Sequence, residues 1–194
     1  MYNKILKRLF DLILSTMVIL FLFPVFIITF ILVKLDSKGP FFFFQERLGK
    51  EGSVFKVFKI RTMTDKPRVA NREILSGDSE VTRVGAVLRR LKIDELPQII
   101  NIWKGDMSFV GPRPCLPELK KEFDENGKER LKVRPGLSGL AQINGNIYLS
   151  WSERWEYDAE YVKNHSFLLD LKIIFKTFLI VIFGEEKFIK KTDA

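Results

Sequence analysis

An uncharged stretch near the start of the chain constrains the fold more than any other feature. Between residues 12 and 33 no side chain carries a charge, and one serine and two threonines are the only clearly polar ones. A run of this length is sufficient for a helix to cross the hydrocarbon core of a bilayer. It is longer than the apolar part of a secretory signal and continues into Lys34 without a small-residue cleavage site, so we expect it to be retained.

Pro24 and the surrounding charges leave two arrangements of this helix open. Proline displaces the carbonyl one turn earlier and removes a backbone donor, so the helix should bend at Pro24. Lysines and arginines lie on both sides of the run, which favours the cytoplasm for both ends. The residues alone are consistent with a broken helix that re-enters the same face and with a proline-kinked helix that spans the membrane.

The pattern of the remaining chain predicts an α+β fold that is mostly helical. Residues 41–44 and 54–60 predict two short strands that form a β-hairpin around Gly49 and Gly52. The four consecutive phenylalanines lie beside the membrane segment, so we expect their burial to be mixed between hairpin and lipid. Residues 64–80 are polar and predict a loop, with or without a short helix in it.

Helical spacing of apolar residues continues in three further segments. Residues 84–103 carry such a pattern up to Gly105, and two helices are predicted to meet near Asp94. Residues 151–162 place aromatic and charged side chains in helical order. Residues 167–183 are strongly apolar but contain charged residues, so this helix is amphipathic rather than spanning, and both a core position and docking at the membrane interface fit it.

Charge and rare residues narrow the chemistry. The formal net charge of +8 predicts an anionic partner, which charge alone does not identify as nucleic acid, acidic membrane or phosphorylated substrate. Cys115 is the only cysteine, so no internal disulfide can form. His165 is the only histidine, which argues against a Ser-His-Asp triad and against His-Cys zinc sites. We therefore expect catalysis by carboxylates and cations. No nucleic-acid motif is present, so we expect no nucleic-acid partner.

Carboxylates and arginines are concentrated between residues 82 and 114. Asp94 and Glu95 are adjacent; Arg89 precedes them and Arg113 follows them in a Gly-Pro-Arg-Pro turn. Phosphoryl transfer needs a nucleophile, an oxygen ligand for Mg²⁺ and cations for phosphate oxygens, and these residue types supply all three. The simpler alternative is that Asp94 caps the following helix and that the arginines are solvated surface charges.

Several ordered motifs resemble one known family. They are Lys7-Arg8, Gln45-Glu46-Arg47, Phe58-Lys59-Ile60-Arg61-Thr62-Met63, Asp94-Glu95-Leu96-Pro97-Gln98, Lys104-Gly105-Asp106-Met107-Ser108, Gly111-Pro112-Arg113-Pro114 and Arg134-Pro135-Gly136. Together they resemble the bacterial sugar transferase family over nearly the whole chain. Its small members are monotopic phosphoglycosyl transferases, and the similarity is closest to those that act on UDP-diacetylbacillosamine.

The resemblance implies a covalent mechanism. The carboxylate of Asp94 would attack the β-phosphate of a UDP-sugar, expel UMP and form a phosphosugar ester, which polyprenyl phosphate then cleaves. Glu95 would bind the cofactor Mg²⁺, so Asp94 and Glu95 are the expected catalytic pair, and we expect nearby arginines to keep Asp94 ionised. The expected substrate phosphate-binding residues are Arg89, Arg113, Lys59 and Arg61.

The resemblance also implies a location. It places a re-entrant helix broken at Pro24 at residues 1–36, and a cytoplasmic catalytic domain with membrane-associated amphipathic helices at residues 37–194. Both ends of the chain would lie on the cytoplasmic face of the bacterial inner membrane, in contact with lipids, at the first membrane step of glycoconjugate assembly. Phe23 stands where small members often have serine, and Asn146 where the family often has arginine.

Two other functions fit the sequence. A hexose-1-phosphate transferase that uses UDP-galactose or UDP-glucose would perform the same chemistry on another donor. A non-catalytic protein that binds the membrane surface would use the positive charge alone, but the carboxylate pair has no use in binding polyanions.

Overall fold

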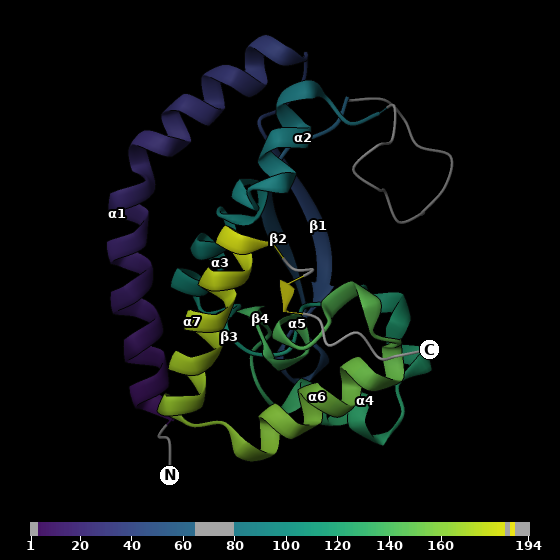
Figure 1. Ribbon diagram of the computed structural model, residues 1–194. Coiled ribbons are helices and arrows are strands. Elements are labelled where there is room, and N and C mark those ends of the chain that lie inside the picture. Colours follow the sequence, from purple (N-terminus) through teal and green to yellow (C-terminus); the bar gives the residue numbers. More distant parts are fainter. Residues whose placement is uncertain (1–3, 65–79, 185–186, 189–194) are drawn as a thin grey trace.

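The computed structural model describes residues 4–64, 80–184 and 187–188 (Figure 1). It confirms the predicted α+β class, with mostly helical content, a long apolar first helix and a small antiparallel hairpin. In chain order the helices and strands are α1 (Lys4–Asp36), β1 (Phe42–Leu48), β2 (Val54–Ile60), α2 (Arg83–Arg90), α3 (Gln98–Lys104), β3 (Ser108–Val110), α4 (Glu125–Glu129), β4 (Gly136–Ser138), α5 (Leu140–Ile143), α6 (Trp151–Asn164) and α7 (Phe167–Phe183).

Helix α1 is continuous through Pro24 and bends. Figure 1 shows its first turns running along one side of the molecule and its later turns curving over toward α2. Proline removes the amide that would bind the carbonyl of Leu20 and displaces that carbonyl, which is a recognised cause of helix bending. The hydroxyl of Thr29 donates to the carbonyl of Val25 at 2.9 Å, so this polar side chain is satisfied within the helix.

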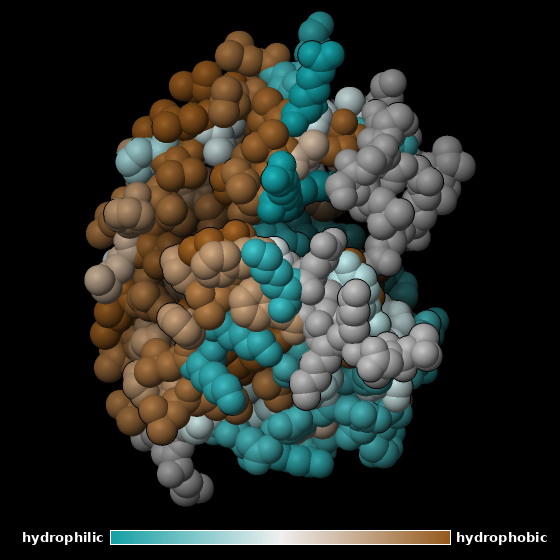
Figure 2. Space-filling view, viewed as in Figure 1, coloured by the Kyte–Doolittle hydropathy of each residue, from teal (hydrophilic) through white to brown (hydrophobic). Residues whose placement is uncertain are grey.

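A broad apolar surface covers α1 and α7. Helix α1 is long and apolar enough to cross a membrane, and only 11% of its most apolar window is buried, which distinguishes it from the core helix of a soluble protein. Phe21, for example, is 82% exposed. Figure 2 shows the apolar side chains of α1 and α7 forming one continuous face. A face of this extent favours contact with lipid over contact with water.

The predicted hairpin is present. Strands β1 and β2 pair antiparallel from Phe42↔Ile60 to Leu48↔Val54, so β1 is longer than predicted because its polar second half also pairs. Phe41 is buried and the next three phenylalanines are exposed, as expected for mixed burial, and their contact with lipid stays a prediction. The predicted loop at residues 64–80 lies almost entirely outside the described residues.

The helices around the predicted site also form as expected. Helices α2 and α3 meet at the 3-10 turn η2 (Ile93–Glu95), and Gly105 ends α3 with a φ of 95°. The parallel pair of β3 and β4 was not predicted, because strands of three residues are too short for a period-two pattern. A side chain at Gly136 would place its Cβ 2.1 Å from the backbone nitrogen of Gly111, so glycine is needed for this pairing.

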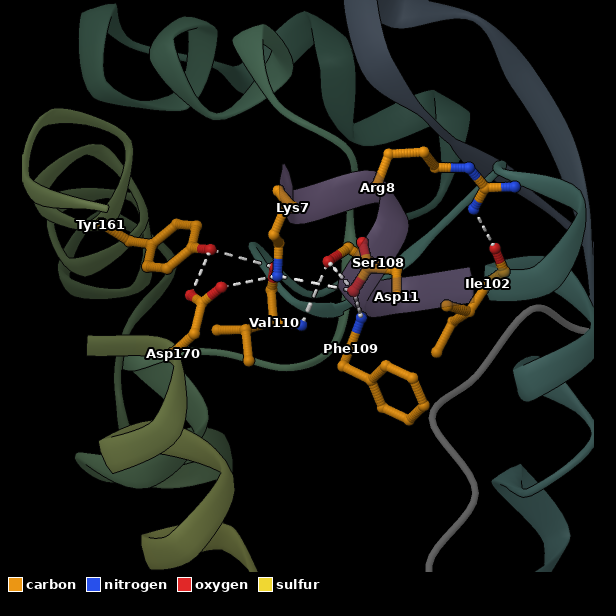
Figure 3. A network of polar contacts seen from close by, with 9 residues as sticks. All are labelled: Lys7, Arg8, Asp11, Ile102, Ser108, Phe109, Val110, Tyr161 and Asp170. Atoms are coloured by element: carbon orange, nitrogen blue, oxygen red, sulfur yellow. Dashed lines mark hydrogen bonds and ion pairs between the residues drawn. The ribbon is translucent and has the colours of Figure 1, made fainter. Parts of the chain in front are cut away.

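A buried polar network fastens the start of α1 to the rest of the protein (Figure 3). The Lys7 ammonium donates to Asp170 of α7 at 2.7 Å, and the Tyr161 hydroxyl of α6 donates to the same carboxylate at 2.8 Å. The Ser108 hydroxyl of β3 donates to the fully buried Asp11 at 3.1 Å. Four elements therefore meet through complementary charged and polar groups.

Arg8 makes a second connection from the same part of α1. Its guanidinium donates to the carbonyls of Ile102 at 2.6 Å and Trp103 at 2.7 Å, which belong to the last turn of α3. A cation at this position satisfies carbonyls that a helix leaves unbonded at its C-terminus. The start of α1 thus fixes the helix that immediately follows the candidate site.

Candidate active site

The adjacent carboxylates lie on a sharp turn. Asp94 and Glu95 belong to η2, which begins after Lys92 in the left-handed conformation with a φ of 56°. A non-glycine residue in this conformation is uncommon and costs roughly 1 kcal/mol or more. The strain is located at the turn that presents both carboxylates.

Glu95 is held by two cations from distant segments. Arg113 Nη2 lies 2.6 Å from Glu95 Oε1 and Nη1 lies 3.3 Å from Oε2, a nearly bidentate arrangement. Lys59 of β2 donates to Oε1 at 3.0 Å, and the Glu95 side chain is only 13% exposed. Burial acts to raise the pKa of Glu95, but the charges and hydrogen bonds of Arg113 and Lys59 outweigh it and hold that pKa well below its ordinary value.

Asp94 has the opposite character. Burial raises its pKa and the neighbouring Glu95 charge raises it further, while Lys59, Arg89 and Lys92 act to lower it and are outweighed. Arg89 acts in the expected direction, toward the ionised form, but the net shift of the Asp94 pKa is upward. Adjacent carboxylates whose pKa values are pushed apart are suited to different roles.

The capping alternative for Asp94 is also wrong. Pro97 occupies the N-cap position of α3, and none of the side chains that the structure describes caps that helix or the turn before it. Within the described part of the chain, the carboxylate of Asp94 accepts no hydrogen bond. It remains available to a substrate.

The other predicted cations occupy different places. Arg89 donates through Nε to the hydroxyl of Thr62 at 2.8 Å and contributes to the electrostatic field at Asp94. Arg61 is buried and donates to the backbone carbonyls of Ser37, at 2.8 Å, and of Lys38, just beyond the end of α1. The structure thus joins Lys59 and Arg113 at Glu95, and uses Arg61 to hold the chain after α1.

Arg47 is a further cation near the site that sequence reasoning did not select. Burial lowers its pKa, Arg113 lowers it further, and Glu95 is among the groups that raise it, so the three residues share one electrostatic environment. Its Nη2 donates to Gln45 Oε1 at 2.6 Å. The hairpin register provides the missed signal. Lys59 pairs with Phe43, and Gln45 and Arg47, two and four residues further along β1, lie on the same face of the hairpin as Phe43 and Lys59.

The carboxylates fit Mg²⁺. No cluster of three or more His, Cys, Asp or Glu side chains suited to a metal occurs among the described residues. Mg²⁺ needs only one or two carboxylates, because water and substrate phosphate fill its other positions. Asp94 accepts no hydrogen bond from described residues, and the contact of Glu95 Oε2 with Arg113 is long at 3.3 Å, so both carboxylates retain unused lone pairs.

Comparisons with known proteins identify the family of this chain. The family described as bacterial sugar transferase matches residues 2–184. The uncharacterized sugar transferase EpsL of Bacillus subtilis (strain 168) is 42% identical over 181 residues, which cover 93% of this chain and 89% of the relative. The exopolysaccharide production protein ExoY of Sinorhizobium fredii (strain NBRC 101917 / NGR234) is 39% identical over 187 residues, which cover 88% of this chain and 83% of that protein.

A longer relative has a more specific name. The UDP-glucose:undecaprenyl-phosphate glucose-1-phosphate transferase of Escherichia coli (strain K12) is 40% identical over 185 residues, which cover 90% of this chain and 40% of that protein. The match to the family extends over nearly the whole chain and includes the turn with Asp94 and Glu95. This chain therefore belongs to the bacterial sugar transferase family.

Proposed function

We propose that this protein transfers a sugar 1-phosphate from a UDP-sugar to a polyprenyl phosphate such as undecaprenyl phosphate, with release of UMP. The observation that carries the proposal is the pairing of an Asp94 carboxylate, which accepts no hydrogen bond from the described residues, with a Glu95 carboxylate held by Lys59 and Arg113. This arrangement provides a free oxygen nucleophile beside two cations, as transfer between phosphate groups requires. The name of the Escherichia coli relative describes this reaction for glucose.

The first half of the reaction forms a covalent intermediate on Asp94. An Asp94 carboxylate oxygen attacks the β-phosphorus of the UDP-sugar, and the bond from that phosphorus to the bridging oxygen breaks. UMP leaves with the bridging oxygen and its electron pair. Lys59 and Arg113 stabilise the phosphate charge, and Arg89 adds to the positive field near Asp94.

The second half regenerates the enzyme. A phosphate oxygen of polyprenyl phosphate attacks the same phosphorus, the bond to Asp94 breaks, and the product diphosphate leaves with the sugar. The carboxylate is then free for another donor. Transfer in two steps allows a soluble nucleotide and a membrane-bound lipid to use one site in turn.

Mg²⁺ completes this proposal. Glu95 would hold the ion, with Asp94 close by, and when bound it would neutralise charge on the donor diphosphate. Glu95 stays ionised at neutral pH because Arg113 and Lys59 keep its pKa low despite burial, so its oxygens remain suitable for a hard cation.

The donor is best assigned among UDP-sugars by direct assay. The motif resemblance favours UDP-diacetylbacillosamine, whereas the name of the Escherichia coli relative favours UDP-glucose. Purified protein with Mg²⁺ is mixed with each donor in turn, UDP-galactose included, and released UMP is measured. Release from one donor supports the enzyme, whereas no release from any donor would favour a non-catalytic binder at the membrane surface.

Removal of Arg113 tests the role of the cations. Arg113→Ala should lower kcat/KM for the donor by roughly 100-fold, because a preorganised cation for phosphate charge is lost. The Mg²⁺ requirement should stay unchanged, because Lys59 still lies 3.0 Å from Glu95. UMP release is measured against donor and Mg²⁺ concentration, with Arg83→Ala as an exposed arginine control. Unchanged donor kinetics in Arg113→Ala would contradict phosphate binding.

The membrane arrangement is part of the same proposal. The apolar face of α1 and α7 supports docking on a bilayer, where the polyprenyl chain of the acceptor resides (Figure 2). We infer that α1 is re-entrant in the bacterial inner membrane and that the catalytic domain faces the cytoplasm, because both flanks of α1 are basic and Pro24 lies within it.

Pro24→Ala tests re-entry. Alanine restores the backbone donor and favours a straight helix long enough to span, so the amino terminus should shift toward the periplasm. A cysteine tag placed before residue 1 is labelled in intact cells with a membrane-impermeant maleimide. The parent tag should be protected and the Pro24→Ala tag should be labelled, while Pro40→Ala, which lies outside α1, should match the parent. A labelled parent tag would refute re-entry.

A further inference from the structure

A buried ion pair binds the backbone next to the Arg113 side chain. Arg130 belongs to the 3-10 turn η4 (Arg130–Lys132), directly after α4, and Asp158 lies on α6. Arg130 Nε lies 3.1 Å from Asp158 Oδ2, and the two side chains are 6% and 3% exposed. Arg130 Nη2 also donates to the backbone carbonyl of Arg113. Figure 1 shows α4 and α6 side by side.

Stability alone does not explain this ion pair well. Removing two charges from water costs several kcal/mol for each ion, and the attraction between them repays this only when the remaining polar atoms are satisfied. Arg130 Nη1 and Asp158 Oδ1 are buried and lack a hydrogen-bond partner among the described residues. A pair that is costly and incompletely bonded is better explained by the geometry that it imposes on the Arg113 carbonyl, the third group in this contact.

That third partner is a short segment with unusual backbone constraints. Arg113 is flanked by two prolines, which have no amide hydrogen. The carbonyl of Pro112 accepts the Gly136 amide at 2.9 Å, and the carbonyl of Cys115 accepts the amide at the end of β1 at 2.9 Å. Arg130 binds the carbonyl between these two fixed points, and so sets the orientation of the residue whose side chain reaches Glu95.

We propose that Arg130, oriented by Asp158, is a positioning residue that directs the Arg113 guanidinium onto Glu95. Arg130 acts through the carbonyl of Arg113. Arg130 Nε binds Asp158 and Nη2 binds that carbonyl, so one rigid guanidinium fixes two groups at once. The effect on catalysis rests on the proposed function, whereas the effect on the geometry of Arg113 does not.

A double-mutant cycle tests this coupling. Asp158→Asn should lower kcat/KM for the donor roughly tenfold, mainly through KM, because Arg113 is no longer held in place. In protein that already carries Arg113→Ala, the same change should alter kcat/KM less than about twofold, because the positioned group is absent. Full additivity of the two substitutions would overturn the proposal.

A second buried pair supplies the matched control. Asp170→Asn breaks the ion pair with Lys7, which is 2.7 Å long and fully buried at its carboxylate, and which joins α7 to the start of α1. Its effect should add to that of Arg113→Ala. If Asp158→Asn does not fold, Arg130→Lys enters the same cycle, because lysine keeps the charge but lacks the fork that reaches both partners.

The pH dependence gives a readout that a purely structural role would not produce. Burial raises the pKa of Asp158 to about 6, although Arg130 and Arg154 act to lower it. The Cys115 thiol also faces the pair, and burial raises its pKa, so it stays neutral in the relevant range. UMP release is measured without acceptor, and the ratio of parent to Asp158→Asn activity should fall toward one as the pH drops through about 6, because Asp158 becomes protonated in the parent. A constant ratio would contradict the proposal.

Thermal unfolding of the same four proteins separates this inference from the proposed function. The cycle needs no substrate, and the shifts in Tm caused by Asp158→Asn and Arg113→Ala should be non-additive because one substitution disturbs the contact that the other removes. Additive shifts would overturn the positioning role. A parent that releases no UMP from any UDP-sugar, but shows non-additive shifts, would overturn the proposed function alone.

Discussion

Asp94→Asn should abolish UMP release and should leave no sugar label on the protein. The amide keeps the shape of the side chain but lacks the charge and nucleophilicity of the carboxylate, so turnover should fall by roughly 10³-fold or more. Donor labelled in the sugar is mixed with enzyme and Mg²⁺ without acceptor, and the protein is denatured and counted. The parent should retain label, and its steady-state kinetics should be ping-pong.

The fold of the variant must be checked in the same experiment. Asp94 accepts no hydrogen bond from the described residues and its burial disfavours the charged form, so Asp94→Asn should unfold at or slightly above the parent temperature. Near-parent activity in this folded variant would remove Asp94 from catalysis. UMP release that depends strictly on acceptor, with no labelled enzyme, would indicate direct transfer in a ternary complex.

Glu95→Gln should cause the second largest loss. Activity should fall roughly 10²- to 10³-fold, and more Mg²⁺ should be needed, because an amide is a poorer and uncharged ligand. Unfolding free energy should fall by about 2–4 kcal/mol, since Lys59 and Arg113 lose their charged partner. Magnesium titrations and denaturant unfolding measure the two effects, with the exposed Glu122→Gln as control. A parent-like magnesium titration would show that Glu95 is not the ligand.

The pH dependence of this stability follows from the direction of the pKa shift. Although burial opposes ionisation, Arg113 and Lys59 hold the pKa of Glu95 below its ordinary value of 4.5, so the folded state favours the ionised form. The stabilising contribution is complete above pH 4.5 and is lost as the pH falls toward the folded-state pKa. The stabilities of the parent and Glu95→Gln should therefore converge in acid.

Regular patterns in the sequence predicted the regular parts of the fold. The predicted segment 167–183 is the observed α7, because a long run of helical spacing dominates local alternatives. The predicted strand 54–60 likewise matches β2. The β3 and β4 pair was not predictable, since two three-residue strands are defined only by their contact across the chain.

The sequence shows which charged residues are adjacent but not how the fold surrounds them. Adjacency of Asp94 and Glu95 is visible in the sequence, but burial, which drives the pKa of Asp94 upward, depends on the whole fold. Lys59 and Arg61 are two residues apart, and a continuous strand would place both on one face. Strand β2 ends at Ile60, so Arg61 turns toward the end of α1 while Lys59 reaches Glu95. The phosphate-binding role of Arg61 stays a prediction.

The fastening of α1 has a practical consequence for anyone who wishes to study the enzyme without a membrane. Removing residues 1–36 as a detachable anchor would strip the Arg8 guanidinium from the last carbonyls of α3 and the Asp11 carboxylate from Ser108. The truncated protein would leave the last carbonyls of α3 and the Ser108 hydroxyl without these partners. Detergent or nanodisc samples that keep the helix whole are the material in which the active site can be expected to survive.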